Sequence, residues 1–146
     1  MNRIVAGVPV ASDRPGSLNS TDLWYAVKKE GGWSPPRRVH GPVNTPCDEL
    51  SPMFGPEGTV VFASAGHAGH GGYDLFTSAY TLAGDSLSLT APRNLGAPVN
   101  TAFDELFPYW HTNESFYFSS DRPRREGEER KDFDVFVFTP KRIAPR

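Results

Sequence analysis

Apolar residues in this chain fall into short runs that are bounded by Gly, Pro, Asp and Ser. The clearest runs are TVVFAS at 59–64, SFYFSS at 115–120 and FDVFVFT at 133–139. Runs of this length that are rich in β-branched and aromatic residues, with turn residues on both sides, are typical of β-strands. No stretch carries an apolar stripe with the spacing of an α-helix, so the pattern predicts an all-β fold.

Three phrases recur in the same order along the chain. The phrase GPVNTPCDELSP, at 41–52, returns as APVNTAFDELFP at 97–108. Two other phrases occur three times: an extended segment that closes on a small polar turn, at 8–16, 60–69 and 116–124, and an Asp followed by an apolar pair, at 21–27, 73–79 and 133–139. The spacings differ only at the expected turns, where insertions are tolerated. We therefore divide a single domain, 1–146, into repeats at about 8–47, 48–103 and 104–146.

Each repeat is expected to contain about four antiparallel strands. In the most complete repeat we expect them at 49–54, 59–64, 73–80 and 88–95. Such a unit, recurring in tandem, is typical of a β-propeller blade, which becomes stable when neighbouring blades cover its faces. The phrase at 41–52 would then cross from the outermost strand of one blade to the innermost strand of the next. Its Gly and Pro would shape the turn, while its Asn, Thr and Asp would bond backbone groups.

The count of strands gives one complete blade, from Asp48 to about Gly96, between two partial ones. The first blade lacks its innermost strand unless 1–5 supplies it, and the last lacks its outermost strand unless 143–146 does. Closed propellers usually have four to eight blades, so three would leave apolar sheet faces open. We expect either a part of a larger propeller or a homodimer that closes a six-bladed ring.

Several of these phrases, taken together, resemble a known family. SDRPG at 12–16, followed by DLW, WSPP, GPVNT, DELSP and VVFAS, is similar to the TolB-type, WD-like propeller repeat of bacterial periplasmic and outer-membrane-associated proteins. The resemblance covers about 8–139 and implies a periplasmic or envelope-associated location, although the chain shows no clear signal-peptide layout. The second repeat departs from the pattern, with SAGHAG in place of SDRPG and no Trp of WSPP. A kelch-type propeller is the nearest rival, because of GGY at 71–73, but that glycine pair does not recur.

Composition narrows the range of partners. The 146 residues include 15 Lys and Arg against 17 Asp and Glu, and this even balance argues against nucleic acid as a partner. No apolar segment is long enough to span a membrane. Cys47 is the only cysteine, so neither an intrachain disulfide nor a multi-cysteine zinc site can form, and we expect it to serve as a structural small hydrophobic residue.

Two pairs of carboxylates recur on the crossings, Asp48 with Glu49 and Asp104 with Glu105. They are candidates for a ring around the channel mouth that binds a cation or a basic peptide. The alternative is that each Asp caps a turn and each Glu is solvated, and recurrence in every repeat favours this architectural role.

The hairpin tips hold four further binding candidates, His67, His70, Arg14 and Arg122. The two histidines are close enough in sequence to share a metal, but no third ligand is near, and their Gly-rich surroundings predict a mobile tip; no metal is expected. We expect the charged hairpin at 121–132 to be a solvated loop. Most of five large aromatic residues are expected in the core between blades: Trp24, Trp33, Phe107, Tyr109 and Trp110.

The sequence carries little that indicates catalysis. It contains no nucleophile elbow, no paired-histidine metalloprotease motif and no phosphate-cradling loop before a helix. We therefore expect a binding or scaffold module without a cofactor, which presents hairpin tips and a channel mouth to a protein partner or to another copy of itself. Two alternatives stay open. The chain could be the propeller domain of a glycan or peptide hydrolase, or a structural half-propeller that only self-assembles.

Overall fold

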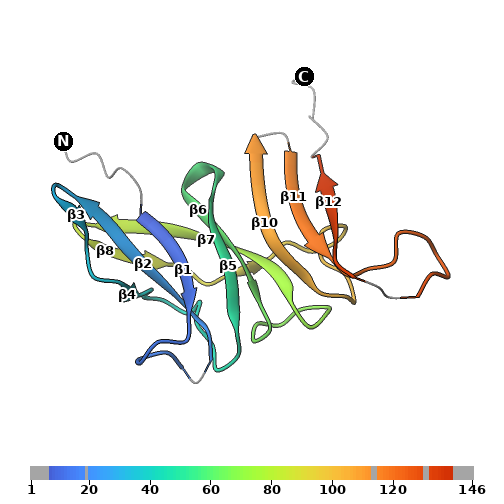
Figure 1. The fold of residues 1–146 in the computed structure, drawn as a ribbon, viewed down its shortest axis with the longest axis horizontal. Helices are drawn as coiled ribbons and strands as arrows, with labels where there is room; N and C mark the ends of the chain where they lie inside the picture. The colour runs from blue at the N-terminus through green and yellow to red at the C-terminus, as the bar shows by residue number, and fades with distance from the viewer. Residues whose placement is uncertain (1–6, 19, 113–114, 130–131, 140–146) are drawn as a thin grey trace.

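The computed structural model describes residues 7–18, 20–112, 115–129 and 132–139, and within these ranges the chain folds into antiparallel β-sheets (Figure 1). The predicted all-β class is confirmed. The helical content of the described ranges is one short 3-10 turn, η1 (Pro56–Gly58). None of the helical segments in these ranges has the length and apolar character needed to cross a membrane.

The strands form three sheets that follow one another along the chain. The first sheet contains β1 (Gly7–Ser12), β2 (Asp22–Lys29), β3 (Gly32–Trp33) and β4 (Arg37–Arg38), and both short strands pair with β2. The second contains β5 (Glu49–Gly55), β6 (Thr59–Ser64), β7 (Asp74–Ala83), β8 (Ser86–Leu89) and β9 (Arg93–Asn94), in the order β5-β6-β7-β8 with β9 also on β7. The third contains β10 (Glu105–Thr112), β11 (Ser115–Ser120) and β12 (Asp134–Phe138), in chain order.

The second sheet tests the strand predictions for the most complete repeat. The strands expected at 49–54, 59–64 and 73–80 correspond to β5, β6 and β7. The strand expected at 88–95 is instead divided into β8 and β9, on either side of Pro92, which has no N–H to donate to a strand ladder. The additional strands expected at 1–5 or 143–146 lie outside the described residues.

The three sheets can be aligned through their pairing. In each, one strand ends on a serine that pairs with the aspartate opening the next strand: Ser12 with Asp22, Ser64 with Asp74, and Ser120 with Asp134. In the second and third sheets the same serine also pairs with a glutamate on its other side, Glu49 or Glu105. Within the described residues, no strand pairs with that side of β1. As far as the described residues go, the first sheet therefore has one strand fewer at this edge than the other two sheets.

The strands that open the second and third sheets share a bulge. Ser51 in β5 and Phe107 in β10 both have a positive φ, 50° and 52°, both precede a proline, and both lie where the pairing register shifts. A bulge of this kind bends a strand and increases its twist. The repetition of the phrase DELxP therefore reflects repetition of a specific backbone shape.

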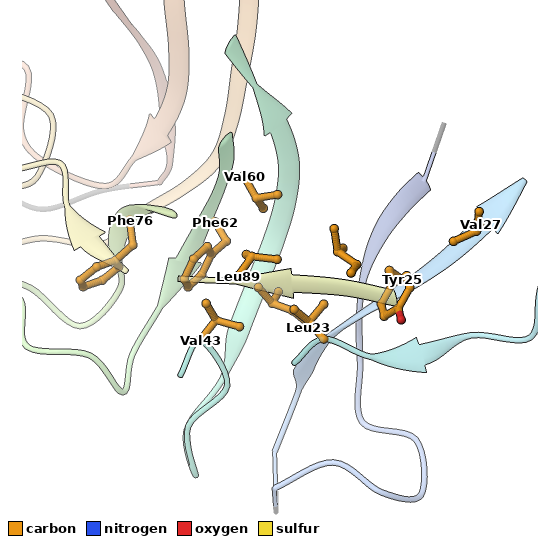
Figure 2. Packing of buried hydrophobic residues seen from close by; sticks show 10 residues of the cluster. Leu23, Tyr25, Val27, Val43, Val60, Phe62, Phe76 and Leu89 are labelled. Carbon is orange, nitrogen blue, oxygen red and sulfur yellow. The ribbon is translucent and has the colours of Figure 1, made fainter. Parts of the chain in front are cut away.

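The first core lies between the first and second sheets. Leu23, Tyr25 and Val27 of β2 belong to the same cluster of buried side chains as Val60 and Phe62 of β6 (Figure 2). These side chains are at most 4% exposed, and alternation along each strand places them on a single face.

A second core lies on the opposite face of the second sheet. Val61, Ala63 and Leu75 pack there against Phe116 and Phe118 of β11. Successive residues of β6 thus enter two different cores, and the second sheet is buried on both faces. This explains why β6 has a continuous apolar run, whereas β11 alternates between buried and half-buried residues.

Candidate functional site

Glu49 lies at the end of the first crossing and is fully buried. Its carboxylate accepts hydrogen bonds from the backbone N–H and the hydroxyl of Thr45, both at 2.7 Å, and from the hydroxyl of Ser64 at 2.8 Å. Burial raises the pKa of this carboxyl group above its ordinary value, although the three hydrogen bonds oppose the rise. The carboxylate therefore holds the crossing against the end of β6.

Glu105 repeats this arrangement at the second crossing. It is also fully buried, and it accepts hydrogen bonds from Thr101 N–H at 2.9 Å, from the Thr101 hydroxyl at 2.7 Å and from the Ser120 hydroxyl at 2.9 Å. A fourth bond comes from Arg122 Nη2, also at 2.9 Å. The expectation that each Glu is solvated was wrong, because each one satisfies donors that the crossing leaves without a strand partner.

The aspartate of each crossing reaches back to the preceding sheet. Asp48 accepts hydrogen bonds from Thr21 N–H at 2.9 Å, from the Ser20 hydroxyl and from the Tyr73 hydroxyl at 3.1 Å, while Asp104 accepts one from Tyr73 N–H at 3.0 Å. The bonds from Ser20 and Thr21 lower the pKa of Asp48 below its ordinary value. The predicted capping role of Asp48 and Asp104 is confirmed.

The asparagine of each crossing binds the backbone of the preceding sheet at two points. Asn44 Oδ1 accepts from Leu23 N–H at 2.7 Å, and Asn44 Nδ2 donates to Leu23 C=O at 3.2 Å. Asn100 bonds both backbone groups of Leu75 in the same way, at 2.9 and 2.8 Å. The asparagine thus takes the place of a strand partner where the ladder ends. The prediction that this residue bonds backbone groups is confirmed.

Arg122 packs against the second crossing. Its guanidinium lies over the rings of Phe118 and Phe136, at 5.1 and 4.9 Å from the ring centres, and donates to the carbonyl oxygens of Pro98 and Val99 as well as to Glu105. A guanidinium can do all of this because it is planar and carries several donors. Arg122 therefore joins a hairpin tip to a crossing.

His67 plays the equivalent part at the first crossing. Its ring lies beside Phe62 and Phe76, which correspond to Phe118 and Phe136, and its Nε2 is 2.9 Å from the carbonyl oxygen of Val43. The second repeat therefore replaces the guanidinium with an imidazole. His70, in contrast, is exposed, and its backbone N–H donates to Asp74 at 2.6 Å.

The glycines of the second hairpin tip lie close to the crossings. Gly66 lies against Thr45, and Gly71 and Gly72 lie against Phe103 and Asp104, so closely that a Cβ atom at any of these glycines would overlap the crossing. The tip is therefore packed between the two crossings, and the small residues permit that approach.

Arg14 keeps part of the geometry of Arg122. Its guanidinium lies 5.2 Å from the centre of the Trp24 ring, and its Nε is 3.3 Å from the Ser12 hydroxyl. Trp24 corresponds to Phe136, and Ser12 to Ser120. Arg14 itself is exposed, and within the described residues it forms no ion pair.

Two expectations about burial were wrong. Cys47 is exposed on the crossing and does not pack in the core. Of the five aromatic residues, Trp24 is buried and Trp110 half-buried, but Trp33, Phe107 and Tyr109 are 49%, 62% and 56% exposed. The charged hairpin at 121–132 fits its prediction better, since residues 124–129 are all exposed.

The exposed aromatic residues of the third sheet belong to a larger apolar face. Phe107, Tyr109, Val135 and Val137 are each more than half exposed. The first three of these line a hollow of about 410 Å³ together with His111, Tyr117, Phe118 and Ser119. Pairing aligns Val135 with Leu75 and Tyr117 with Val61, and both of these equivalents are buried in the second sheet. The third sheet thus leaves uncovered the face that the second sheet buries.

Several residues of the site were not singled out from the sequence as candidates. They are Thr45 and Thr101, which donate to the glutamates, and Ser64 and Ser120, which end the paired strands. The signal was present, because serine recurs at 12, 64 and 120 and threonine always precedes the glutamate by four residues.

Within the described ranges, no three His, Cys, Asp or Glu side chains gather as a metal site would require. Comparisons with protein-family models, with curated proteins and with solved structures find no match.

Proposed function

We propose that this chain is a non-catalytic β-propeller module that binds protein, with its three sheets as blades. The observation that carries the proposal is the uncovered apolar face of the third sheet, formed by Phe107, Tyr109, Val135 and Val137. Contiguous exposed apolar side chains of this kind mark interaction surfaces. The corresponding face of the second sheet, formed by Val61, Ala63 and Leu75, is buried under the third sheet. This supports another sheet of the same kind as the partner that covers the apolar face of the third sheet.

A second copy can supply that cover through its first sheet. Val10 of β1 corresponds to Phe62 and Phe118, each of which packs into the sheet before it, yet Val10 is 45% exposed. Each copy therefore offers one face of each type, and two copies related by a twofold axis would satisfy both contacts. In this arrangement two sets of three blades form a six-bladed ring.

The recurrent carboxylates favour a binding role over a hydrolytic one. Glu49 and Glu105 are fully buried, and their carboxylates accept hydrogen bonds from the crossings. These carboxylates therefore stabilise the fold and do not face a substrate. Asp48 likewise bonds the preceding sheet. The resemblance of the repeat phrases to TolB-type propellers supports placing the module at the bacterial cell envelope.

Light scattering after size exclusion, over a dilution series, tests the proposal. We expect a species of twice the chain mass of 16.1 kDa. The variant Val135→Asp should give the single-chain mass while keeping its β-sheet circular dichroism, because a buried unpaired charge is excluded from such an interface. The control Trp33→Asp removes an exposed aromatic residue elsewhere and should leave the dimer intact. A wild-type chain that stays monomeric at every concentration would contradict closure by a second copy.

A further inference from the structure

The end of β1 carries the same four residues as the end of β11. Ser12-Asp13-Arg14-Pro15 is identical to Ser120-Asp121-Arg122-Pro123. The two segments occupy equivalent places, because β1 pairs with β2 as β11 pairs with β12, with Ser12 opposite Asp22 and Ser120 opposite Asp134.

In the third sheet this tetrapeptide holds the start of β10. The hydroxyl of Ser120 and the guanidinium of Arg122 each donate to Glu105 at 2.9 Å, and the carboxylate of Asp121 accepts from the backbone N–H of Asp104, also at 2.9 Å. The strand that follows pairs with β11, with Glu105 opposite Ser120. The polar side chains of Ser120, Asp121 and Arg122 therefore all bind the start of β10.

In the first sheet, Ser12, Asp13 and Arg14 occupy the equivalent positions. The described residues, however, contain no strand that these side chains could bind. The side chain of Arg14 is oriented like that of Arg122. Each guanidinium stacks on an aromatic ring. Each also donates a hydrogen bond from Nε to the serine two residues before it, at 3.3 Å for Arg14 and 3.0 Å for Arg122. Asp13 and Arg14 are exposed, and within the described residues β1 pairs only with β2. In the described part of the chain, this edge thus has no strand partner, and it lies next to the oriented guanidinium of Arg14.

We propose that the open edge of β1, together with Ser12, Asp13 and Arg14, is a binding site for an extended acidic strand of a separate polypeptide. The strand would run antiparallel to β1 with its glutamate opposite Ser12, where Arg14 and the serine hydroxyl bind the carboxylate. The carboxylate of Asp13 would accept the backbone N–H of the residue before that glutamate. A threonine four residues before the glutamate would shape the strand's entry, as Thr45 and Thr101 do inside the chain.

The two internal copies of this phrase do not fill the site. Glu49 is bound to Ser64, and Glu105 to Ser120 and Arg122, so each already belongs to its own sheet. The occupant must therefore come from outside the described residues, and a separate polypeptide is the better source because neither 1–6 nor 140–146 contains an acidic residue. The open edge of β1 is a different surface from the apolar face of the third sheet, so binding at one surface can be absent while the other still binds.

A peptide with the sequence of residues 97–112, blocked at both ends, is a direct probe. Titrated into the isotope-labelled full chain, it should give saturable NMR shifts at the amides of β1 and Arg14 and slow the hydrogen exchange of β1. The same peptide with Glu105→Gln should bind about tenfold more weakly, since it loses a hydrogen bond between charged groups. The chain variant Arg14→Ala should show a similar loss for the unmodified peptide.

The matched control is Arg125→Ala, which removes an exposed arginine from the charged hairpin and should bind the peptide as the wild type does. Because Arg14 is exposed, its variant should retain the fold, which circular dichroism can check. The absence of saturable shifts at β1 would overturn the proposal, as would equal binding by the Glu105→Gln peptide or full binding by Arg14→Ala.

Discussion

The imidazole of His67 and the guanidinium of Arg122 hold successive crossings at the same point. His67 Nε2 lies 2.9 Å from the carbonyl oxygen of Val43, and Arg122 donates to that of Val99, the residue that takes the same place in the second crossing. Both side chains also lie beside an equivalent pair of aromatic rings. A histidine and an arginine thus make the same contact with successive crossings. The two neighbouring histidines, His67 and His70, therefore have different roles.

His67→Ala should therefore lower the free energy of unfolding by about 1–2 kcal/mol, through loss of the hydrogen bond to Val43 and of contacts with two rings. His70→Ala should change it by less than about 0.5 kcal/mol, because the His70 side chain is exposed and its backbone N–H stays bonded to Asp74. Urea denaturation of both variants measures the difference. Equal effects would refute the distinction between the two histidines.

The two buried glutamates should differ in their sensitivity to neutralisation. Glu105→Gln leaves the guanidinium of Arg122 without its carboxylate partner, and we expect a loss of about 3 kcal/mol. Glu49→Gln disturbs only neutral donors from Thr45 and Ser64, so a loss of about 1–2 kcal/mol is expected.

Chemical denaturation of the two glutamine variants gives the comparison. The single variant Arg122→Met and the double variant Arg122→Met with Glu105→Gln complete a double-mutant cycle. The double variant should recover part of the loss, since it no longer buries an unpaired charge. If Glu49→Gln proved the more damaging change, the importance of the Arg122 contact would be refuted.

Much of the fold could be predicted because the repeats made local patterns visible several times. The spacings between the repeated phrases differ only at a few places, and these differences located the turns. The segments between these turns coincide with β5, β6 and β7. The strand expected at 88–95 was harder, because proline breaks its pairing and only two short pieces remain on β7.

The candidate site was only partly predictable, because burial depends on contacts between distant segments. The phrase DEL looks polar, and nothing local shows that Glu49 is enclosed by Thr45 and Ser64. Phe107 looks like a core residue, but its face is open because no sheet follows it among the described residues. Exposure of this kind is decided by the neighbours of a sheet, which the strand pattern does not specify.

Asp48 gives a pH dependence whose sign follows from its environment. Its pKa is lowered in the folded chain by hydrogen bonds from Ser20 and Thr21. The unfolded chain therefore binds the proton more tightly, so the stabilisation is present above the ordinary pKa near 4 and is lost as the pH falls through the folded value. At pH 7, Asp48→Asn should cost about 1 kcal/mol.

Denaturation curves at several pH values test this expectation. The difference between wild type and Asp48→Asn should begin to shrink near about pH 4 and should be lost as the pH falls through the lowered pKa of folded Asp48, where the wild-type carboxylate is also neutralised. Asp132→Asn, on the exposed charged hairpin, should match the wild type throughout. A gap for Asp48→Asn that stays constant down to acidic pH would argue against a role for its charge.

The closeness of the second hairpin tip to the crossing gives a steric prediction. A Cβ atom on Gly71 would overlap the backbone carbonyl of Phe103, whereas one on Gly84 would meet open space at a φ of +59°. Gly71→Ala should therefore lower the free energy of unfolding by about 3 kcal/mol, as overpacking against backbone does. Gly84→Ala should cost only about 1 kcal/mol, from the left-handed backbone conformation. Thermal and urea unfolding of the two variants compare a packed glycine with an exposed turn glycine, and similar losses would mean that the tip can move away from the crossing at little cost.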